Sequence, residues 1–261
     1  MSEVVHKEVD AMRLSELVEY LDEYLRTAEV PDDDRAGNGL QVEGRREIRK
    51  VGAAVDASER GIELARAADC DILIVHHGIF WDGLTPLTGR RYRKVSSLVE
   101  SGMALYGSHI PLDLHAEVGN SAVLARALGI ELEGTFGEYR GVEIGWHGRL
   151  PMLREALAAR LDEVLGGRVL MIPGGPKRLE RVGVLTGAGG DAIGQAIASG
   201  LDGLVTGEGP HHTYFAAMED GLNVYYGGHY ATEVWGVKAL AEHLAARFGL
   251  GWEFFDVPTG L

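Results

Sequence analysis

The chain has 261 residues and a formal net charge of −14, from 39 acidic and 25 basic side chains. This length accommodates one large α/β domain or two small ones, and a hydrophobic content of 46% can build a buried core, which excludes wholesale disorder. The negative charge excludes a general nucleic-acid-binding surface, because it repels phosphate.

Two further absences narrow the class of protein. No apolar stretch approaches the roughly 20 residues that span a bilayer, so no membrane contact is expected. The single cysteine, Cys70, excludes an intrachain disulfide and a cysteine-based zinc site. We therefore expect a cytoplasmic protein. Its acidic, lysine-poor composition is compatible either with a salt-adapted cytoplasm or with a GC-rich genome that favours Arg and Ala.

The first half of the chain begins with an amphipathic helix over 14–25, where leucines recur at helical spacing. A loop follows, with a turn at Asn38-Gly39. From Val51 onward, short apolar runs alternate with helical segments. We expect a strand over 51–55, a helix over 59–68, a strand over 71–75, a helix over 96–100, a strand over 104–107 and a helix over 121–128.

The second half repeats the same order. We expect a strand over 182–185, a helix over 192–199, a strand over 203–206, a helix over 212–219, a strand over 223–226, a helix over 234–248 and a strand over 252–257. Between the halves, a helix over 153–165 and a strand over 168–172 precede a linker at 173–176. The pattern predicts an α/β fold of two similar halves, with sheets flanked by helices: residues 1–130, a connecting segment 131–180, and residues 181–261.

An internal duplication accounts for this repetition. Residues 51–78 align with residues 182–209 without a gap over 28 positions, with identities at both ends. Further along, His109-x-x-x-Asp113 matches His229-x-x-x-Glu233, and each follows a strand that contains a tyrosine. The matched spacing at both ends favours duplication over a chance likeness of two strand-helix-strand units.

The residues able to do chemistry follow predicted strands. His76 and His77 come after the strand over 71–75, and Gly78 permits a turn that aims both at one site. His109 and Asp113, His212, and His229 with Glu233 follow three other strands. Because ligands bind at the carboxyl edge of open α/β sheets, we expect these groups to gather at one rim.

Imidazole and carboxylate ligands without a thiolate suit Zn²⁺, Mn²⁺, Fe²⁺ or Co²⁺. Three histidines and two carboxylates exceed the needs of one tetrahedral zinc and fit a pair of metals about 3.5–4 Å apart. His109 and His212 are compatible with ligands, with donors that orient a ligand, or with proton shuttles.

Three motifs resemble those of the Nif-three-like proteins, also called GTP cyclohydrolase I type 2 homologues: His76-His77-Gly78, Ser108 to Asp113, and Gly227 to Glu233. Thr206-Gly207-Glu208 and Asn38-Gly39-Leu40-Gln41 also match the pattern of that family, and the likeness extends from about Leu14 to Pro258. The resemblance implies a toroidal homohexamer, a trimer of dimers, with two divalent metal ions per chain facing an interior cavity. It implies the metal ligands His76, His77, Asp113, His229 and Glu233.

Two functions remain open at this point. The first is a metal-dependent hydrolase acting on a nucleotide-like substrate, in which two metals activate water and the catalytic residues His109 and His212 move protons. The alternative is a non-catalytic metal-binding, metal-delivery or regulatory oligomer. Both need the same ligands.

Overall fold

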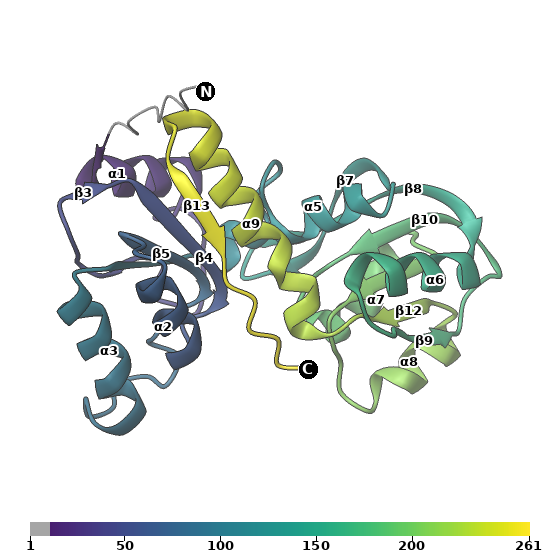
Figure 1. Cartoon of the computed structure of the whole chain (residues 1–261). Coiled ribbons are helices and arrows are strands. Elements are labelled where there is room, and N and C mark those ends of the chain that lie inside the picture. The colour runs from purple at the N-terminus through teal and green to yellow at the C-terminus, as the bar shows by residue number, and fades with distance from the viewer. Residues whose placement is uncertain (1–10) are drawn as a thin grey trace, which may run out of the picture. The chain divides into compact units, whose positions relative to one another are not determined.

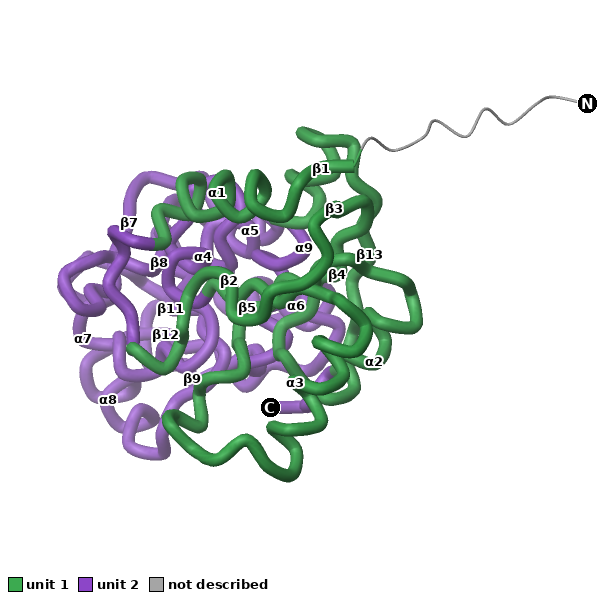
Figure 2. Tube along the Cα trace, turned by 90° about the vertical axis from the view of Figure 1, so that its left-hand side faces the viewer, with its two compact units in different colours: residues 1–27, 34–108, 240–257 green, residues 28–33, 109–239, 258–261 purple. Residues whose placement is uncertain are grey.

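The structure, a computed structural model, describes residues 11–261 as two compact units (Figures 1 and 2). Unit 1 comprises the described residues up to Thr27, with Asp34–Ser108 and Leu240–Val257. Unit 2 comprises Ala28–Asp33, His109–Ala239 and Pro258–Leu261. Each unit contains one main sheet flanked by helices, which confirms the predicted α/β class. Among the described residues, no helix is both long and apolar enough to cross a membrane.

Unit 1 contains a five-stranded sheet in the order β13-β4-β5-β6-β2. Its strands are β2 (Gly39–Val42), β4 (Lys50–Asp56), β5 (Ile72–His77), β6 (Ala104–Gly107) and β13 (Gly251–Phe254). All pairs are parallel except β2 with β6. Continuous buried runs in β4 and β5 explain the central position of these two strands, because a parallel strand is covered on both faces.

Helices α2 (Glu59–Ala67) and α3 (Gly89–Ser101) pack on this sheet through a core that includes Ile62, Leu98 and Leu73. Helix α1 (Leu14–Tyr24) packs against the C-terminal part of α9 (His229–Phe248), where Tyr20 contacts Phe248 edge to face. A two-stranded ribbon of β1 (Met12–Arg13) and β3 (Glu47–Ile48) completes the unit.

Unit 2 contains a six-stranded sheet in the order β7-β8-β10-β11-β12-β9. Its strands are β7 (Glu131–Tyr139), β8 (Val142–Leu153), β9 (Leu170–Pro173), β10 (Arg178–Val184), β11 (Gly203–Thr206) and β12 (Asn223–Tyr226). The three central strands β10, β11 and β12 are parallel to one another, and their neighbours β8 and β9 are antiparallel to them. The edge strand β7 is antiparallel to β8.

Both faces of this sheet are covered, because successive residues of each strand point to opposite sides. Val205 and Tyr225 lie in one core with helices α5 (Asn120–Ala127) and α6 (Arg154–Leu165). Leu204 and Val224 lie in the other core with α7 (Ile193–Ala198), α8 (Thr213–Asp220) and the 3-10 turn Gly189–Ala192. Helix α4 (Ile110–Asp113) and residues 229–239 of α9 also belong to unit 2.

The predicted duplication is visible in the hydrogen bonds. In unit 1, Asp71 Oδ2 accepts from the backbone N–H groups of Arg49 and Lys50. In unit 2, Asp202 Oδ2 accepts from the backbone N–H groups of Glu180 and Arg181, which are the aligned residues. The strand registers also match, since Val51 pairs with Ile72 as Val182 pairs with Gly203.

Three local expectations differ from the structure. The long hairpin of β7 and β8 was not predicted, because glycines and charged residues interrupt its alternation and its turn is Arg140-Gly141, both with positive φ, rather than Asn-Gly. The linker prediction at 173–176 is wrong, since this stretch joins β9 to β10 within one sheet. Helix α9 begins at His229, five residues earlier than predicted.

Candidate metal centre

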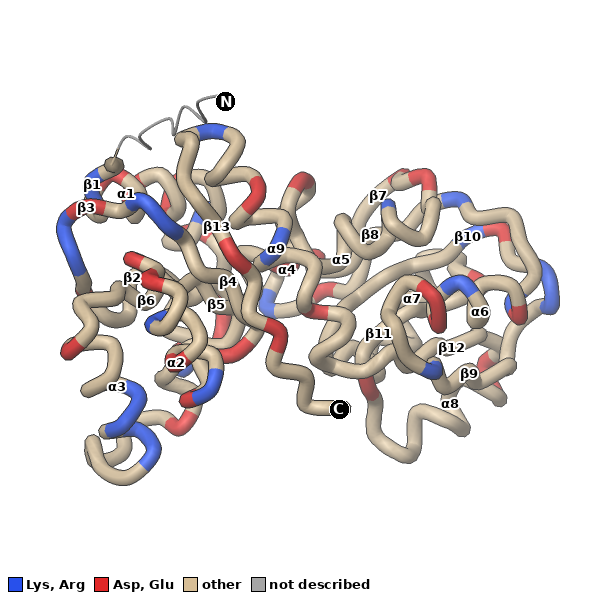
Figure 3. The backbone as a smooth tube through the Cα atoms, in the orientation of Figure 1, with Lys and Arg blue, Asp and Glu red and all other residues tan. Residues whose placement is uncertain are grey.

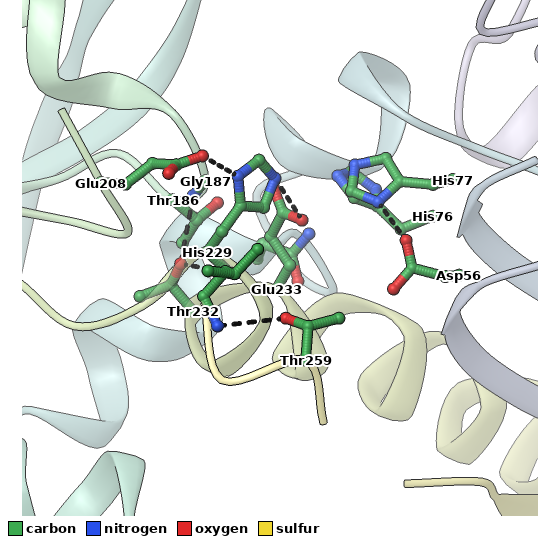
Figure 4. A network of polar contacts seen from close by, with 12 residues as sticks. Asp56, His76, His77, Thr186, Gly187, Glu208, His229, Thr232, Glu233 and Thr259 are labelled. Carbon is green, nitrogen blue, oxygen red and sulfur yellow. Dashed lines mark hydrogen bonds and ion pairs between the residues drawn. The ribbon is translucent and has the colours of Figure 1, made fainter. Parts of the chain in front are cut away.

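His76 and His77 are the last two residues of β5, which runs two residues beyond the predicted strand. The Nδ1–H of buried His76 donates to the carbonyl oxygen of Ser108 at 2.9 Å. The Nδ1–H of His77 donates to Asp56 Oδ1, also at 2.9 Å (Figure 4). The two ring centroids are 4.6 Å apart. Because Nδ1 carries the proton, the lone pair of each ring lies on Nε2, which is the state that binds a cation.

Gly78, which follows the two histidines, was predicted to permit a turn. Its φ is not positive, so a turn is not the reason why glycine is needed at this position. A Cβ at Gly78 would lie 2.1 Å from Nε2 of Gln41. The Gln41 amide donates to the carbonyl oxygens of Ala36 and Gly37 and accepts from Ile79 N–H, each at 2.9 Å. Glycine is therefore required here by the close approach of Gln41, which fixes the backbone that follows the histidines.

In unit 2, His229 and Glu233 lie on the first turns of α9, on one helix face as their spacing predicts. His229 Nε2 is 3.2 Å from Glu233 Oε2, and His229 Nδ1 is 2.7 Å from Glu208 Oε1 (Figure 4). Glu233 foremost, and then Glu208, raise the pKa of His229 to about 9, because both carboxylates stabilise the imidazolium. A divalent cation held by Nε2 and Glu233 would replace that proton.

Gly187 allows these two side chains to approach the backbone closely. Its φ is +67°, and a Cβ there would lie 2.2 Å from Glu233 Oε1 and 3.4 Å from His229 Nε2. The Gly187 N–H donates to Thr232 Oγ1 at 3.1 Å, which ties the loop to α9. Only glycine satisfies both the backbone conformation and the close approach, so this position is shaped around the ligand atoms.

Asp113 is the last residue of α4 and is buried. Its Oδ1 accepts from Asn120 Nδ2 at 2.9 Å and from Thr186 Oγ1 at 3.4 Å. The Asn120 amide oxygen accepts in turn from Gly236 N–H on α9 at 2.6 Å. Asn120 thus links the Asp113 carboxylate to the helix that carries His229.

The two predicted catalytic histidines have different surroundings. His109 Nδ1 lies 2.9 and 3.1 Å from the two carboxylate oxygens of Asp32, whose side chain is only 6% exposed. This is the arrangement that orients a functional imidazole. The His212 side chain is 72% exposed and lies 3.5 Å from Asp191 Oδ1. The contacts described above for the proposed ligands of unit 2 do not involve His212.

Each unit thus presents donors of the kind that bind divalent cations. Unit 1 offers two imidazole nitrogens, and unit 2 offers an imidazole and two carboxylates. The close approach of Gly187 to Glu233 and His229, together with the proton-bearing Nδ1 atoms, is compatible with a bound metal ion. The expectation of a single rim is wrong in one respect, since β5 and β6 belong to one sheet and β11 and β12 to another.

Sequence reasoning missed the residues that orient the histidines. Asp56 ends β4, and its pairing opposite His77 follows from the strand register. Asp32 lies in a run of three aspartates that indicates only a loop. Glu208 follows β11, two residues beyond Thr206, and belongs to the Thr206-Gly207-Glu208 motif that matches the family pattern, but the motif did not indicate its contact with His229. The role of each carboxylate can be recognised only once the structure shows which histidine it contacts.

These features define an α/β protein with histidine and carboxylate groups that could bind a divalent metal ion. Residues 12–259 match the model of the family described as Duf34/NIF3 (NGG1p interacting factor 3). A protein of Deinococcus radiodurans named "GTP cyclohydrolase 1 type 2 homolog" is 44% identical over 249 residues, covering 94% of each chain. A protein of the same name from Pyrococcus abyssi is 43% identical, covering 96% of this chain and all of its own.

Two solved structures have the same fold as this chain. The protein ybgI superposes with a TM-score of 0.89 at 36% identity, and the protein TTHA1606 from Thermus thermophilus with a TM-score of 0.84 at 45% identity. Each comparison covers 96% of this chain and all of the other. The chain belongs to the Duf34/NIF3 family.

Proposed function

We propose that the chain binds two divalent metal ions and uses them to hydrolyse a nucleotide-like substrate. The observation that carries the proposal is that His76, His77 and His229 each have Nδ1 against an acceptor of their own unit, which directs Nε2 to a cation. The proposed ligands are these three histidines with Asp113 and Glu233. The name "GTP cyclohydrolase 1 type 2 homolog" of its relatives supports the substrate class.

The donor count supports two ions rather than one. Two imidazoles from unit 1 and one from unit 2 supply three nitrogens, and the two carboxylates supply four oxygens. A carboxylate shared by the two ions would offset the repulsion between them, and Glu233 is our candidate for this role because its carboxylate contacts the imidazole of His229. Zn²⁺, Fe²⁺, Mn²⁺ and Co²⁺ all suit this set.

Bound divalent ions would supply Lewis-acid chemistry that lowers the pKa of water toward neutrality. The protein's own contribution is orientation and proton movement. His109, held by Asp32 through Nδ1, would take a proton at Nε2 and return it to a ring nitrogen of the substrate. His212 stays a candidate for a second proton shuttle. For a guanine-like substrate, water would add to the ring carbon between two nitrogens and open the ring.

The test is a screen of purified protein against nucleotides, before and after chelation and after metal is restored. Hydrolysis should require metal and should fall by about 10²-fold or more in His109→Ala, the range expected when a proton-transfer group is removed. Metal-loaded protein that turns over none of the nucleotides would contradict the hydrolase and favour metal binding or delivery without turnover.

A further inference from the structure

Lys94, on α3, has surroundings that distinguish it from two other lysines of the chain. The ammonium group of Lys50 pairs with Glu253 Oε2 at 2.8 Å, and the side chain of Lys177 is exposed. Lys94 is half-buried, and within residues 11–261 its ammonium group has neither a hydrogen bond nor an ion pair. Burial without a partner disfavours the charged form of a lysine, which is the condition that makes the amine reactive.

Lys94 lines a cavity of about 470 Å³ between α2 and α3, and Figure 3 shows basic residues on α3. Arg93 donates to both carboxylate oxygens of Glu59 at 2.7 Å, and Arg60 donates to Glu63 Oε2 at 2.9 Å. These four side chains also line the cavity, so two guanidinium groups are each offset by a carboxylate and Lys94 is left as the uncompensated charge. The lining therefore favours a small anion, although the whole chain carries −14.

The charges around Lys94 act in both directions on its amine. Burial foremost, and then the positive charge of Arg90, lower the pKa of Lys94. The carboxylates of Asp82, Glu59 and Asp56 oppose this shift without cancelling it. At a given pH a larger fraction of Lys94 is therefore neutral amine, and the neutral amine is the nucleophilic form.

We propose that Lys94 is a modification site that takes an acyl group from a small acyl phosphate held in this cavity. The phosphate of the donor would lie against the guanidinium groups of Arg60 and Arg93, which leaves the acyl carbon for Nζ of Lys94. The Nζ lone pair attacks the acyl carbon and forms a C–N bond. The C–O bond to phosphate breaks, the phosphate leaves with that electron pair, and the amine proton passes to water. The product is a neutral amide, so the uncompensated charge disappears.

This modification site is separate from the proposed metal centre. Its side chains all belong to unit 1, and none of them is a proposed metal ligand. The proposal requires neither bound metal nor hydrolysis, so its failure would leave the proposed function untouched.

Mass spectrometry of the whole chain after treatment with acetyl phosphate tests the proposal, because the lysines of one molecule compete for the same donor. Lys177 and Lys50 are internal controls. Lys177 is exposed, and a hydrogen bond to Glu253 foremost raises the pKa of Lys50. We expect Lys94 to be acetylated faster than either, although it is less exposed than Lys177. Acetylation that follows exposure, with Lys177 ahead of Lys94, would overturn the proposal.

A substitution in the lining tests whether the cavity holds the donor. In Arg60→Gln the acetylation of Lys94 by acetyl phosphate should slow by about two- to fivefold, the range expected for one exposed charge contact. Arg66→Gln is the matched control, because Arg66 is an exposed residue of α2 outside the lining, and it should not slow the reaction. The uncharged acetyl ester of N-hydroxysuccinimide should acetylate Lys94 equally in both variants. An unchanged rate with acetyl phosphate in Arg60→Gln, or an equal slowing with the uncharged ester, would contradict binding of the donor in the cavity.

Discussion

At the scale of single residues, the candidate metal centre depends on side chains that do not themselves reach the metal. Asp56, Asp32 and Glu208 each face the Nδ1 of one histidine, and Ser108 presents a carbonyl to a fourth. Such partners fix the ring orientation and raise the basicity of the ligand. The histidine motifs were identified from the sequence, and Glu208 was noted as part of a motif that matches the family pattern. The pairing of these partners with the histidines was not predicted, because it joins segments that are distant in the sequence.

Glu208 offers the sharpest test of this role, because its Oε1 lies 2.7 Å from His229 Nδ1. In Glu208→Ala the imidazole loses the acceptor that orients it. We expect metal affinity, measured by calorimetry, to fall by about 10- to 100-fold. Glu208→Gln keeps an acceptor oxygen and should lose less. Glu219→Gln removes an exposed carboxylate of α8 and serves as the control. Equal affinities in Glu208→Ala and the wild type would contradict the role.

Gly187 can be tested by a matched pair of substitutions. Gly187→Ala and Gly166→Ala both place alanine at a φ near +68°, so each should cost about 1–2 kcal/mol of unfolding free energy. Only Gly187→Ala also pushes a Cβ against Glu233, since nothing lies within 4 Å at Gly166. We therefore expect Gly187→Ala to lose at least as much stability as Gly166→Ala by denaturant titration, and metal binding to weaken in Gly187→Ala alone. Equal metal affinity in both variants would show that the close approach of Gly187 to Glu233 does not affect metal binding.

At the scale of elements, the buried parallel strands and the helices between them could be predicted because their apolar runs are uninterrupted. The strands β6, β11 and β12 have the predicted bounds. The hairpin of β7 and β8 could not be predicted, since Gly134, Gly137, Gly145 and Gly148 break its alternation. The two-residue extension of β5 through His77 was missed because polar residues at a strand end give no apolar signal.

In each half of the chain one aspartate accepts hydrogen bonds from two backbone N–H groups, so we expect its removal to have a similar effect on stability in the two halves. Asp71→Ala and Asp202→Ala each leave two backbone N–H groups without their acceptor. We expect each variant to lose about 1–3 kcal/mol of unfolding free energy, because each loses two hydrogen bonds to a charged acceptor. Asp34→Ala, at an exposed loop position, should lose far less. Denaturant unfolding measures the stability of all three variants. A loss of stability in only one of Asp71→Ala and Asp202→Ala would contradict an equivalent role for the two aspartates.

At the scale of the whole molecule, we propose that the chain forms the homohexamer its family resemblance implies. Each chain carries −14, so six copies repel one another unless salt screens them. Light scattering should give about six times 28.2 kDa at moderate or high salt, and dissociation should be favoured at low salt. A monomer at every ionic strength would contradict this assembly.

The central claim, a two-metal site, is tested most directly by elemental analysis of chelator-stripped and then metal-reconstituted protein. We predict two divalent ions per chain in the wild type. Glu233→Gln keeps the side-chain volume but removes the charge that would offset two adjacent cations, so it should retain only one tightly bound ion. His109→Ala should retain two if His109 only moves protons. A firm value of one ion per chain in the reconstituted wild type would contradict the account.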